Sequence, residues 1–336
     1  MSKEIRDKIY YYECKLLECV GVQRTTFSRG DDELHALHYL TFGTRSNPPL
    51  LLIHGYGGSG IAFFKVIPQL SKHFYLIIID LLGFGCSDRP SFKFDTFQNT
   101  MQFFTIPIVS LLNYLKVDKI LIVGHSMGGL IAGHLAEIIK DRVTAVFFAA
   151  AAGFTNKDFT QEEAEIMFRK FAKWFDMPTD LMRLFTYLTL EKKYPLFNML
   201  SNSFKFDYIE TYFDNPMLKL TREERDIFVK YYKQVHLLGS GGHNAIWSLV
   251  KFGGYCDHPI IKILSDNPDI IAFVYYGENE WLDWQHAFQE LKRIGQHKNF
   301  RVLKDTTHQI FFNNPSEFLN QFYQDYNLVF RDGLFR

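Results

Sequence analysis

Cysteine is scarce in this chain, with 4 residues among 336. They stand at positions 14, 19, 86 and 256, and no two of them have the spacing of a metal site. So few cysteines in a long chain do not make a disulfide framework, which excludes the small disulfide-stabilised classes of protein. The sequence therefore predicts buried thiols in a reducing compartment and no bound metal.

An excess of either charge is also absent, because 37 Lys and Arg residues balance 37 Asp and Glu residues. This balance argues against a general nucleic-acid or polyanion binder. No stretch approaches 18 uncharged apolar residues, so we expect no transmembrane helix. The first 20 residues are charged from the third onward and lack the apolar core of a signal peptide. We expect a cytoplasmic protein, soluble or peripheral to a membrane.

Apolar residues are abundant: 47% of the chain is hydrophobic and 17% is aromatic, including 34 Phe. Short apolar runs alternate with helical segments at residues 61–72, 96–115 and 128–140. Runs of this length rich in Ile, Val, Leu and Phe are typical of buried strands. The alternation predicts an α/β fold with a mostly parallel, doubly wound sheet. The apolar runs are LHALHYLTF, PLLLIH, FYLIIID, KILIVG, VTAVFFAA, IIAFVYYG and FRVLKD.

The alternation stops near Phe154 and resumes near Ile270, and the residues between are helical in character and rich in aromatics. Open parallel sheets bind ligands at the carboxyl ends of their strands, so an insertion there would roof the site. At the N-terminus, charges interleaved with Ile9 and Leu16 predict a helix that packs on the body rather than a membrane anchor. The predicted organisation is a helical arm at residues 1–34, a core at 35–153 and 262–336, and a helical lid at 154–261.

The strongest motif is Gly124-His125-Ser126-Met127-Gly128, which follows a predicted strand and opens a predicted helix. A G-x-S-x-G nucleophile elbow requires this context. Its serine occupies a strained turn that lifts the hydroxyl above the sheet, and small residues at both ends leave room for that backbone. The helix behind the serine directs its dipole at the site. Ser126 is therefore the predicted nucleophile, and a serine implies an acyl-serine intermediate from an ester, amide or thioester.

A second motif is the turn HGYG at residues 54–57, directly after the strand LLLI. An oxyanion hole needs two backbone N–H groups, and we expect them from Tyr56 and from Met127. The stretch 55–60 also satisfies the dinucleotide-binding pattern G-x-G-x-x-G, with Asp80 about 20 residues further on. The serine elbow downstream makes acyl transfer the more coherent interpretation of this turn.

The general base should be a histidine after the last strand, and His308 in TTHQI has that position. A carboxylate after the preceding strand should orient its imidazole. Two candidates follow the run IIAFVYYG, namely Glu280 and Asp283, and their spacing alone does not separate them. The order serine, acid, histidine is the one expected for such a site. This chemistry needs no metal or organic cofactor.

Four stretches spread over nearly the whole chain resemble α/β-hydrolase-fold serine hydrolases: LLLIHGYGGS, DLLGFGCSDRP, VGHSMGG and THQIFFNNPSEF. Residues 239–245, 252–261 and 276–283 further resemble one lipid-metabolism subfamily. That subfamily includes a lysophospholipase acting on N-acyl-phosphatidylethanolamines and a lipid-droplet protein that co-activates a triglyceride lipase. It also has plant and yeast relatives that are acyltransferases or lipases. The resemblance implies an α/β-hydrolase fold with a helical lid.

The resemblance also bears on the open alternatives. Animal members of the subfamily place the acid where Asp283 stands and plant members where Glu280 stands, and we favour Asp283. The coactivator branch has lost its serine, whereas Ser126 is present here, which favours an active hydrolase. The proposed acyltransferase signature has Asp where this chain has Asn313, which weakens the case for acyl transfer.

The sequence thus predicts a serine hydrolase of acyl glycerolipids or lysophospholipids, with acyl transfer to a lysophospholipid as a variant. The expected partner is the acyl lipid itself, met in the cytoplasm or at lipid droplets and internal membranes, without nucleic acid. The lid segment KFAKWFDMPTDLMRLFTYLTL suits acyl chains better than small polar substrates. The alternatives are a non-catalytic lipid-binding or lipase-coactivator module and a serine hydrolase of small soluble esters or peptides.

Overall fold

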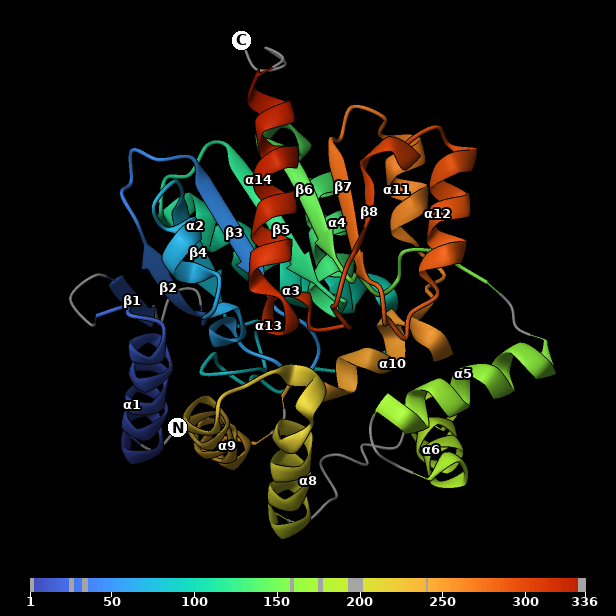
Figure 1. Cartoon of the computed structure of the whole chain (residues 1–336), viewed down its shortest axis with the longest axis horizontal. Coiled ribbons are helices and arrows are strands. Elements are labelled where there is room, and N and C mark those ends of the chain that lie inside the picture. Colours follow the sequence, from blue (N-terminus) through green and yellow to red (C-terminus); the bar gives the residue numbers. More distant parts are fainter. Residues whose placement is uncertain are drawn as a thin grey trace.

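A computed structural model describes residues 3–23, 27–31, 36–157, 160–174, 178–192, 202–239 and 241–331. Its centre is a sheet of eight strands in the order β1-β2-β4-β3-β5-β6-β7-β8 (Figure 1). Strand β2 runs antiparallel to both of its neighbours, β1 and β4. Strands β3 to β8 all run parallel to one another. The strands are β1 (Phe27–Asp31), β2 (His38–Phe42), β3 (Pro49–Ile53), β4 (Tyr75–Ile79), β5 (Ile120–His125), β6 (Val143–Ala149), β7 (Ala272–Gly277) and β8 (Phe300–Leu303). The predicted α/β fold is confirmed, and all seven apolar runs contain a strand.

Helices cover both faces of the sheet, which is why central strands such as β3 and β4 are apolar along their whole length. In β3, Leu51 and Ile53 pack into one hydrophobic cluster, and their neighbours Leu50 and Leu52 pack into another. The first cluster includes α3 (Phe97–Tyr114), α4 (Met127–Ile138), α11 (Ile260–Asp266) and α12 (Trp284–Arg293). The second includes α1 (Lys3–Cys19), α2 (Ile67–Leu70), α9 (Arg222–Leu237), α13 (Ile310–Asn313) and α14 (Pro315–Arg331).

The N-terminal segment differs from the predicted helical arm, because it also contributes the edge strand β1. The sequence of β1, FSRGD, is polar, and an edge strand with one free side needs no continuous apolar run. Helix α1 packs on α9, with Ile9 and Leu16 buried. Residues 1, 2, 24–26 and 32–34 of the predicted arm, and residue 35 after it, lie outside the described residues.

The four cysteines are free thiols, and Cys86 and Cys256 are buried as expected. The expectation of buried thiols is wrong for Cys19, which is exposed, and for Cys14, which is half-buried. Both lie on α1, which has only one side against the body of the protein. A surface helix leaves its other side in solvent whatever residues it carries.

Residues 154–261, called the insertion from here on, contain helices and no strand in their described part. The insertion lies over the carboxyl ends of β3 and β4, because its residues 242–248 contact the segments that follow those strands (Figure 1). Gly242 N–H donates to Gly83 O at 3.1 Å, and Tyr56 Oη–H donates to His243 O at 3.1 Å. Residues 158, 159, 175–177, 193–201 and 240 lie outside the described residues. The helical elements are α5 (Gln161–Trp174), α6 (Thr179–Thr186), η4 (Tyr187–Glu191), α8 (Asn202–Asp214), η5 (Pro216–Leu218), α9, η6 (His243–Ala245), α10 (Ile246–Leu249), η7 (Phe252–Gly254) and the start of α11.

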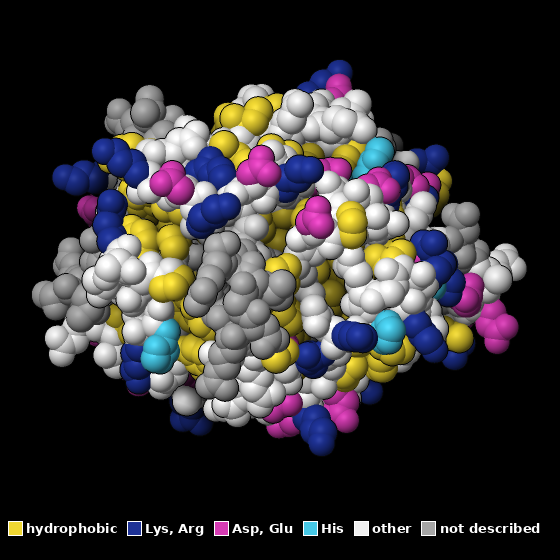
Figure 2. Space-filling view, turned by 90° about the horizontal axis from the view of Figure 1, so that it is seen from above, with side chains coloured by type: hydrophobic (Ala, Val, Ile, Leu, Met, Phe, Trp, Pro, Cys, Tyr) yellow, Lys and Arg dark blue, Asp and Glu magenta, His cyan; other side chains and the backbone are white. Residues whose placement is uncertain are grey.

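The face opposite the insertion carries charges of both signs. Figure 2 views the molecule from the top of Figure 1, and basic and acidic side chains intermix across that face. This agrees with the balanced composition and leaves no broad patch of one sign on the face in view. None of the helices in the described ranges is long and apolar enough to cross a membrane.

Candidate active site

Ser126 stands alone between β5, which ends at His125, and α4, which begins at Met127. Its backbone has φ 53° and ψ −120°, an unfavourable conformation for a residue with a side chain. The glycines on either side are required by close packing. A Cβ on Gly124 would lie 2.4 Å from Gly128 O, and a Cβ on Gly128 would lie 2.4 Å from His54 O. The geometry is that of the strained strand–turn–helix expected from the sequence.

The turn after β3 packs directly against this serine. A Cβ on Gly55 would lie 2.9 Å from Ser126 Cβ, and Gly58 N–H closes the turn by donating to Gly55 O at 3.1 Å. Tyr56 lies inside that turn. Met127 occupies the first turn of α4, where helix N–H groups have no intrahelical acceptor. The backbones of Tyr56 and Met127 therefore flank the nucleophile, as an oxyanion hole requires, and this role stays a prediction.

His308 lies in the loop after β8 and is buried with Glu280. Its Nδ1 is 2.9 Å from Glu280 Oε1 and 3.1 Å from Oε2. An ionised carboxylate only accepts hydrogen bonds, so Nδ1 carries the proton and Nε2 is left as the basic nitrogen. Glu280 Oε1 also accepts from the N–H groups of Trp281 and Leu282, at 2.8 and 3.2 Å. These bonds fix the carboxylate independently of the histidine.

His125 connects the histidine loop to the serine turn. Its Nε2–H donates to His308 O at 2.9 Å, and the two imidazole rings lie 4.9 Å apart. Burial lowers the pKa of His125 well below its usual value, with a further contribution from the nearby His308. His125 is therefore neutral, and as the residue before Ser126 it joins the serine turn to the loop of His308.

Asp283 does not take the place that the resemblance assigned to it, because His308 pairs with Glu280. The Asp283 carboxylate accepts from Tyr255 Oη–H at 2.9 Å and from His286 N–H at 3.0 Å. Asp283 is the N-cap of α12, so its side chain turns toward the first turn of that helix. Glu280 precedes the helix and faces the histidine. The expectation that Asp283 orients His308 is wrong in this geometry, and the alternative, Glu280, is the residue in contact.

The dinucleotide interpretation of the turn at 55–60 finds no support in the geometry. Asp80, which would bind a ribose, is buried and accepts from Gly60 N–H at 2.6 Å and Cys86 N–H at 2.7 Å. His54 is held by Leu81 N–H at 2.9 Å and by Gly55 O at 2.7 Å, and burial lowers its pKa. The side chains of Asp80 and His54 are therefore already hydrogen-bonded to the backbone of the loops near Ser126.

A family model described as alpha/beta hydrolase fold matches residues 48–181. Naproxen esterase from Bacillus subtilis has a similar structure, with a TM-score of 0.65 and 18% identity, covering 97% of this chain and 99% of that one. The protein has the α/β-hydrolase fold.

A 1-acylglycerol-3-phosphate O-acyltransferase of Arabidopsis thaliana is 24% identical over 87% of this chain and 70% of its own length. One of Rattus norvegicus is 25% identical over 81% of this chain and 75% of its own length. This α/β-hydrolase-fold protein is thus distantly related to acyltransferases of plants and animals.

Asn313 has a role in this α/β-hydrolase-fold protein that the sequence did not indicate. Its Oδ1 accepts from Thr307 N–H at 2.9 Å and from the Thr307 hydroxyl at 2.5 Å, which fixes the residue before His308. Its Nδ2 donates to Met217 O in the insertion. An aspartate could accept the two Thr307 bonds but could not donate to Met217. The amide therefore suits a position between the histidine loop and the insertion.

Two more residues near the histidine were missed. Trp281 lies 4.9 Å from the His308 ring, and adjacency to an acid candidate is the sequence signal that could have indicated it. Tyr255 contacts Asp283 from the insertion, 28 positions away in sequence, and no local pattern predicts such a contact.

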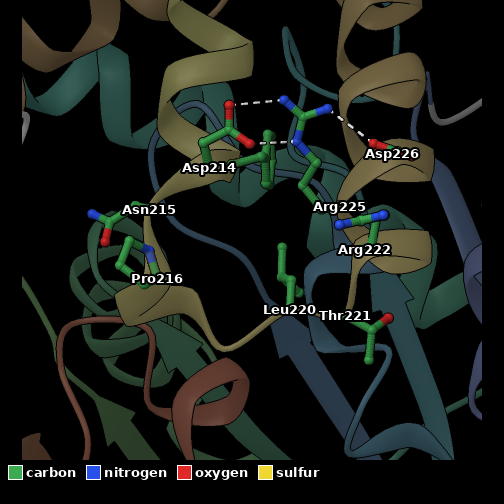
Figure 3. A pocket seen from close by; sticks show the side chains of 9 residues that line it. Asp214, Asn215, Pro216, Leu220, Thr221, Arg222, Arg225 and Asp226 are labelled. Carbon is green, nitrogen blue, oxygen red and sulfur yellow. Dashed lines mark hydrogen bonds and ion pairs between the residues drawn. The ribbon is translucent and has the colours of Figure 1, made fainter.

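One open cavity lies away from Ser126 and His308, neither of which lines it. It has a volume of about 360 Å³ and lies in the insertion, beside Asp214 and Thr221 (Figure 3). Arg225 on its wall is paired with Asp214 at 2.7 Å and with Asp226 at 2.9 Å, so its charge is balanced locally. Ser126 is only 8% exposed.

Proposed function

We propose that this protein is a serine hydrolase that cleaves acyl esters of glycerolipids or lysophospholipids. The observation that carries the proposal is the pairing of a buried His308–Glu280 couple with a serine in a strained turn. A buried acid that fixes the tautomer of a histidine beside a serine is the arrangement that activates a hydroxyl as nucleophile.

The reaction follows from these positions. His308 Nε2 takes the hydroxyl proton as Ser126 Oγ attacks the ester carbonyl. The N–H groups of Tyr56 and Met127 hold the oxyanion. The C–O bond to the alcohol then breaks, and His308 returns its proton to that alcohol. Water next attacks the acyl-serine with His308 as base, which releases the fatty acid and restores the hydroxyl. Glu280 stabilises the imidazolium formed in each half-reaction.

An acyl lipid as partner is supported by the surface of the insertion. Ile166 on α5, Leu181 and Leu184 on α6, and Tyr187 on η4 are each about half exposed. Large apolar side chains gathered on neighbouring helices suit contact with acyl chains or a lipid surface better than with a small polar substrate. We therefore propose that the protein contacts a membrane or lipid droplet peripherally.

Acyl transfer is a second candidate, and it is supported by the relatives named as acyltransferases. In that reaction the hydroxyl of a lysophospholipid replaces water. It gives its proton to His308 and forms a new ester as the bond to Ser126 breaks. The ratio of released fatty acid to newly acylated phospholipid, measured with and without a lysophospholipid acceptor, separates the two reactions.

The first test is labelling of the purified protein with a fluorophosphonate, beside Ser126→Ala and His308→Ala. We expect labelling of the wild type alone, because the probe reacts with an activated serine. A lysophospholipid panel would then identify the substrate. Absence of labelling, also with liposomes added, would contradict the proposal and favour the non-catalytic lipid-binding alternative.

A further inference from the structure

The two ends of the insertion lie side by side. On the outgoing end, Gly153 N–H donates to Gly254 O at 2.6 Å, and on the returning end, Cys256 N–H donates to Thr155 O at 3.1 Å. We call residues 153–157 and 254–257 the outgoing and returning roots. The roots connect the insertion to the sheet. Contacts made by the roots therefore restrict how far the insertion can move relative to the sheet.

Asp283 contacts both roots. From the returning root, Tyr255 Oη–H donates to Asp283 Oδ2 at 2.9 Å. From the outgoing root, Lys157 Nζ lies 3.8 Å from the same oxygen and also pairs with Glu163 in the first turn of α5 at 2.7 Å. Burial and the hydrogen bond to Asp283 raise the pKa of Tyr255, so the phenol keeps the proton that it donates.

A third contact runs through the helix that Asp283 caps. His286 N–H donates to Asp283 Oδ1 at 3.0 Å, and His286 Nδ1 lies 3.0 Å from Thr155 Oγ1. The returning root also packs on this loop, since a Cβ on Gly254 would lie 2.4 Å from Leu282 Cδ2. The roots and the start of α12 thus form one connected unit.

This unit includes the loop that carries Glu280. The Glu280 carboxylate is held by the N–H groups of Trp281 and Leu282, and Asp283 is the next residue. We propose that Asp283 is a positioning residue that couples the roots of the insertion to the loop of Glu280, and thereby to the Glu280–His308 pair. The proposal rests on the proposed function, because Glu280 matters for catalysis only if the serine is active.

The test measures kcat and KM on a soluble short-chain ester, p-nitrophenyl butyrate, for wild type, Asp283→Ala, Asp283→Asn and Tyr255→Phe. We expect Asp283→Ala to lower kcat about tenfold with KM changed less than about twofold, because a displaced acid affects the chemical step more than binding. Asp283→Asn should restore most of kcat, since its amide oxygen can accept from His286 N–H while its Nδ2–H donates to the phenol oxygen of Tyr255. Tyr255→Phe should lower kcat by about threefold, and adding it to Asp283→Ala should lower it little further, because the two residues share one contact.

Asp257 provides the matched control. It lies on the returning root, where it accepts from Asn156 on the outgoing root at 3.3 Å and pairs with Lys251. Within the part of the chain that the structure describes, neither bond reaches the Glu280 loop. Asp257→Ala should leave kcat within about twofold of wild type. An unchanged kcat in Asp283→Ala, an equal loss in Asp257→Ala, or no recovery in Asp283→Asn would overturn the proposal.

A second measurement is independent of activity. Limited proteolysis of the folded protein should cut the insertion faster in Asp283→Ala and Tyr255→Phe than in Glu280→Gln, because only the first two loosen the roots. Equal cleavage in all three would overturn the coupling. If Ser126→Ala hydrolyses the ester as fast as wild type, the proposed function fails instead, and the proteolysis result still decides the coupling.

Discussion

The central strands and the helices α5 and α6 use the same kinds of apolar residue in opposite ways. In the strands, side chains such as Ile77 and Phe148 have no exposed surface, because helices cover both faces of the sheet. In the helices, Leu181 and Leu184 are 51% and 52% exposed. A sheet packed from both sides holds its loops in one arrangement, whereas a helix with an open face is displaced at lower cost. We therefore infer that the sheet fixes the arrangement of Ser126, His308 and Glu280. We infer that the insertion governs access to these residues.

The loop of six residues between β7 and α12, residues 278–283, contacts both regions. Glu280 is the third residue after β7 and is bonded to His308, which lies in the loop after β8. Asp283, three residues later, is bonded to the roots of the insertion. Two carboxylates with nearly the same sequence context thus serve the two regions separately. Each of the following measurements tests whether the regions are as distinct as this.

The largest expected effect is that of Glu280→Gln on ester hydrolysis. A glutamine cannot hold His308 in the productive tautomer or stabilise its imidazolium, so we expect kcat to fall by about 10³–10⁴-fold. Asp283→Asn, the same change three residues away, is the control and should remain close to wild type. A larger loss of kcat in Asp283→Asn than in Glu280→Gln would instead show that Asp283 is the acid that orients His308.

The second effect is on stability. Phe147 in β6 has no exposed surface; its ring stacks on Phe273 at 4.9 Å and contacts the tilted ring of Phe322 at 4.5 Å. Phe147→Ala should lower the free energy of unfolding by about 3–5 kcal/mol through lost burial and a cavity. Leu184→Ala on α6 should change it by less than about 0.5 kcal/mol. Urea denaturation followed by far-UV circular dichroism gives both values, and similar losses would show that the insertion is packed as firmly as the sheet.

The smallest expected effect is the loss of thermal stability at acid pH that two histidines of the insertion cause. Burial lowers the pKa of His236 to about 4 and that of His243 to about 3, the latter with help from the charge of His236. Between these values and the usual pKa of about 6.5, the unfolded chain binds more protons than the folded one, so stability falls as pH falls. We expect the thermal midpoint to drop by a few degrees from pH 7 to pH 5. The double variant His236→Gln/His243→Gln should show a shallower drop, and an equal slope in both proteins would contradict the assignment.

The sequence indicates the sheet well because its strands are buried on both faces. Runs such as KILIVG and IIAFVYYG have no other stable place in a folded chain, and each contains a strand. The polar strand β1 could not be predicted in this way, because its sequence FSRGD has the composition of a turn. It forms a strand only by pairing with β2. The predictions for Ser126 and His308 rest on strand order, because each residue stands in the segment after a strand, and their roles stay predictions.

The choice of acid shows where such reasoning needs one more local signal. Asp283 directly precedes the amphipathic segment WQHAFQELKR, and aspartate is a favoured N-cap. Weighing that preference would have assigned Asp283 to the helix and left Glu280 for the histidine. The contacts of Asn313 with Thr307 and Met217 had no comparable signal, because they join three segments brought together only by the completed fold.

The adjacency of the two roots has a consequence for how this chain can change over evolutionary time. The sheet fixes Gly153 beside Gly254, so the ends of the insertion meet whatever lies between them. Closing a flexible loop of twice the length would cost only about 0.6 kcal/mol more. Helices can therefore be lost, gained or exchanged above the sheet while the strand order and the turn at Ser126 are kept. Changes in the insertion can therefore accumulate without changing the strand order, because the covalent connections between the two regions lie only at the two adjacent roots.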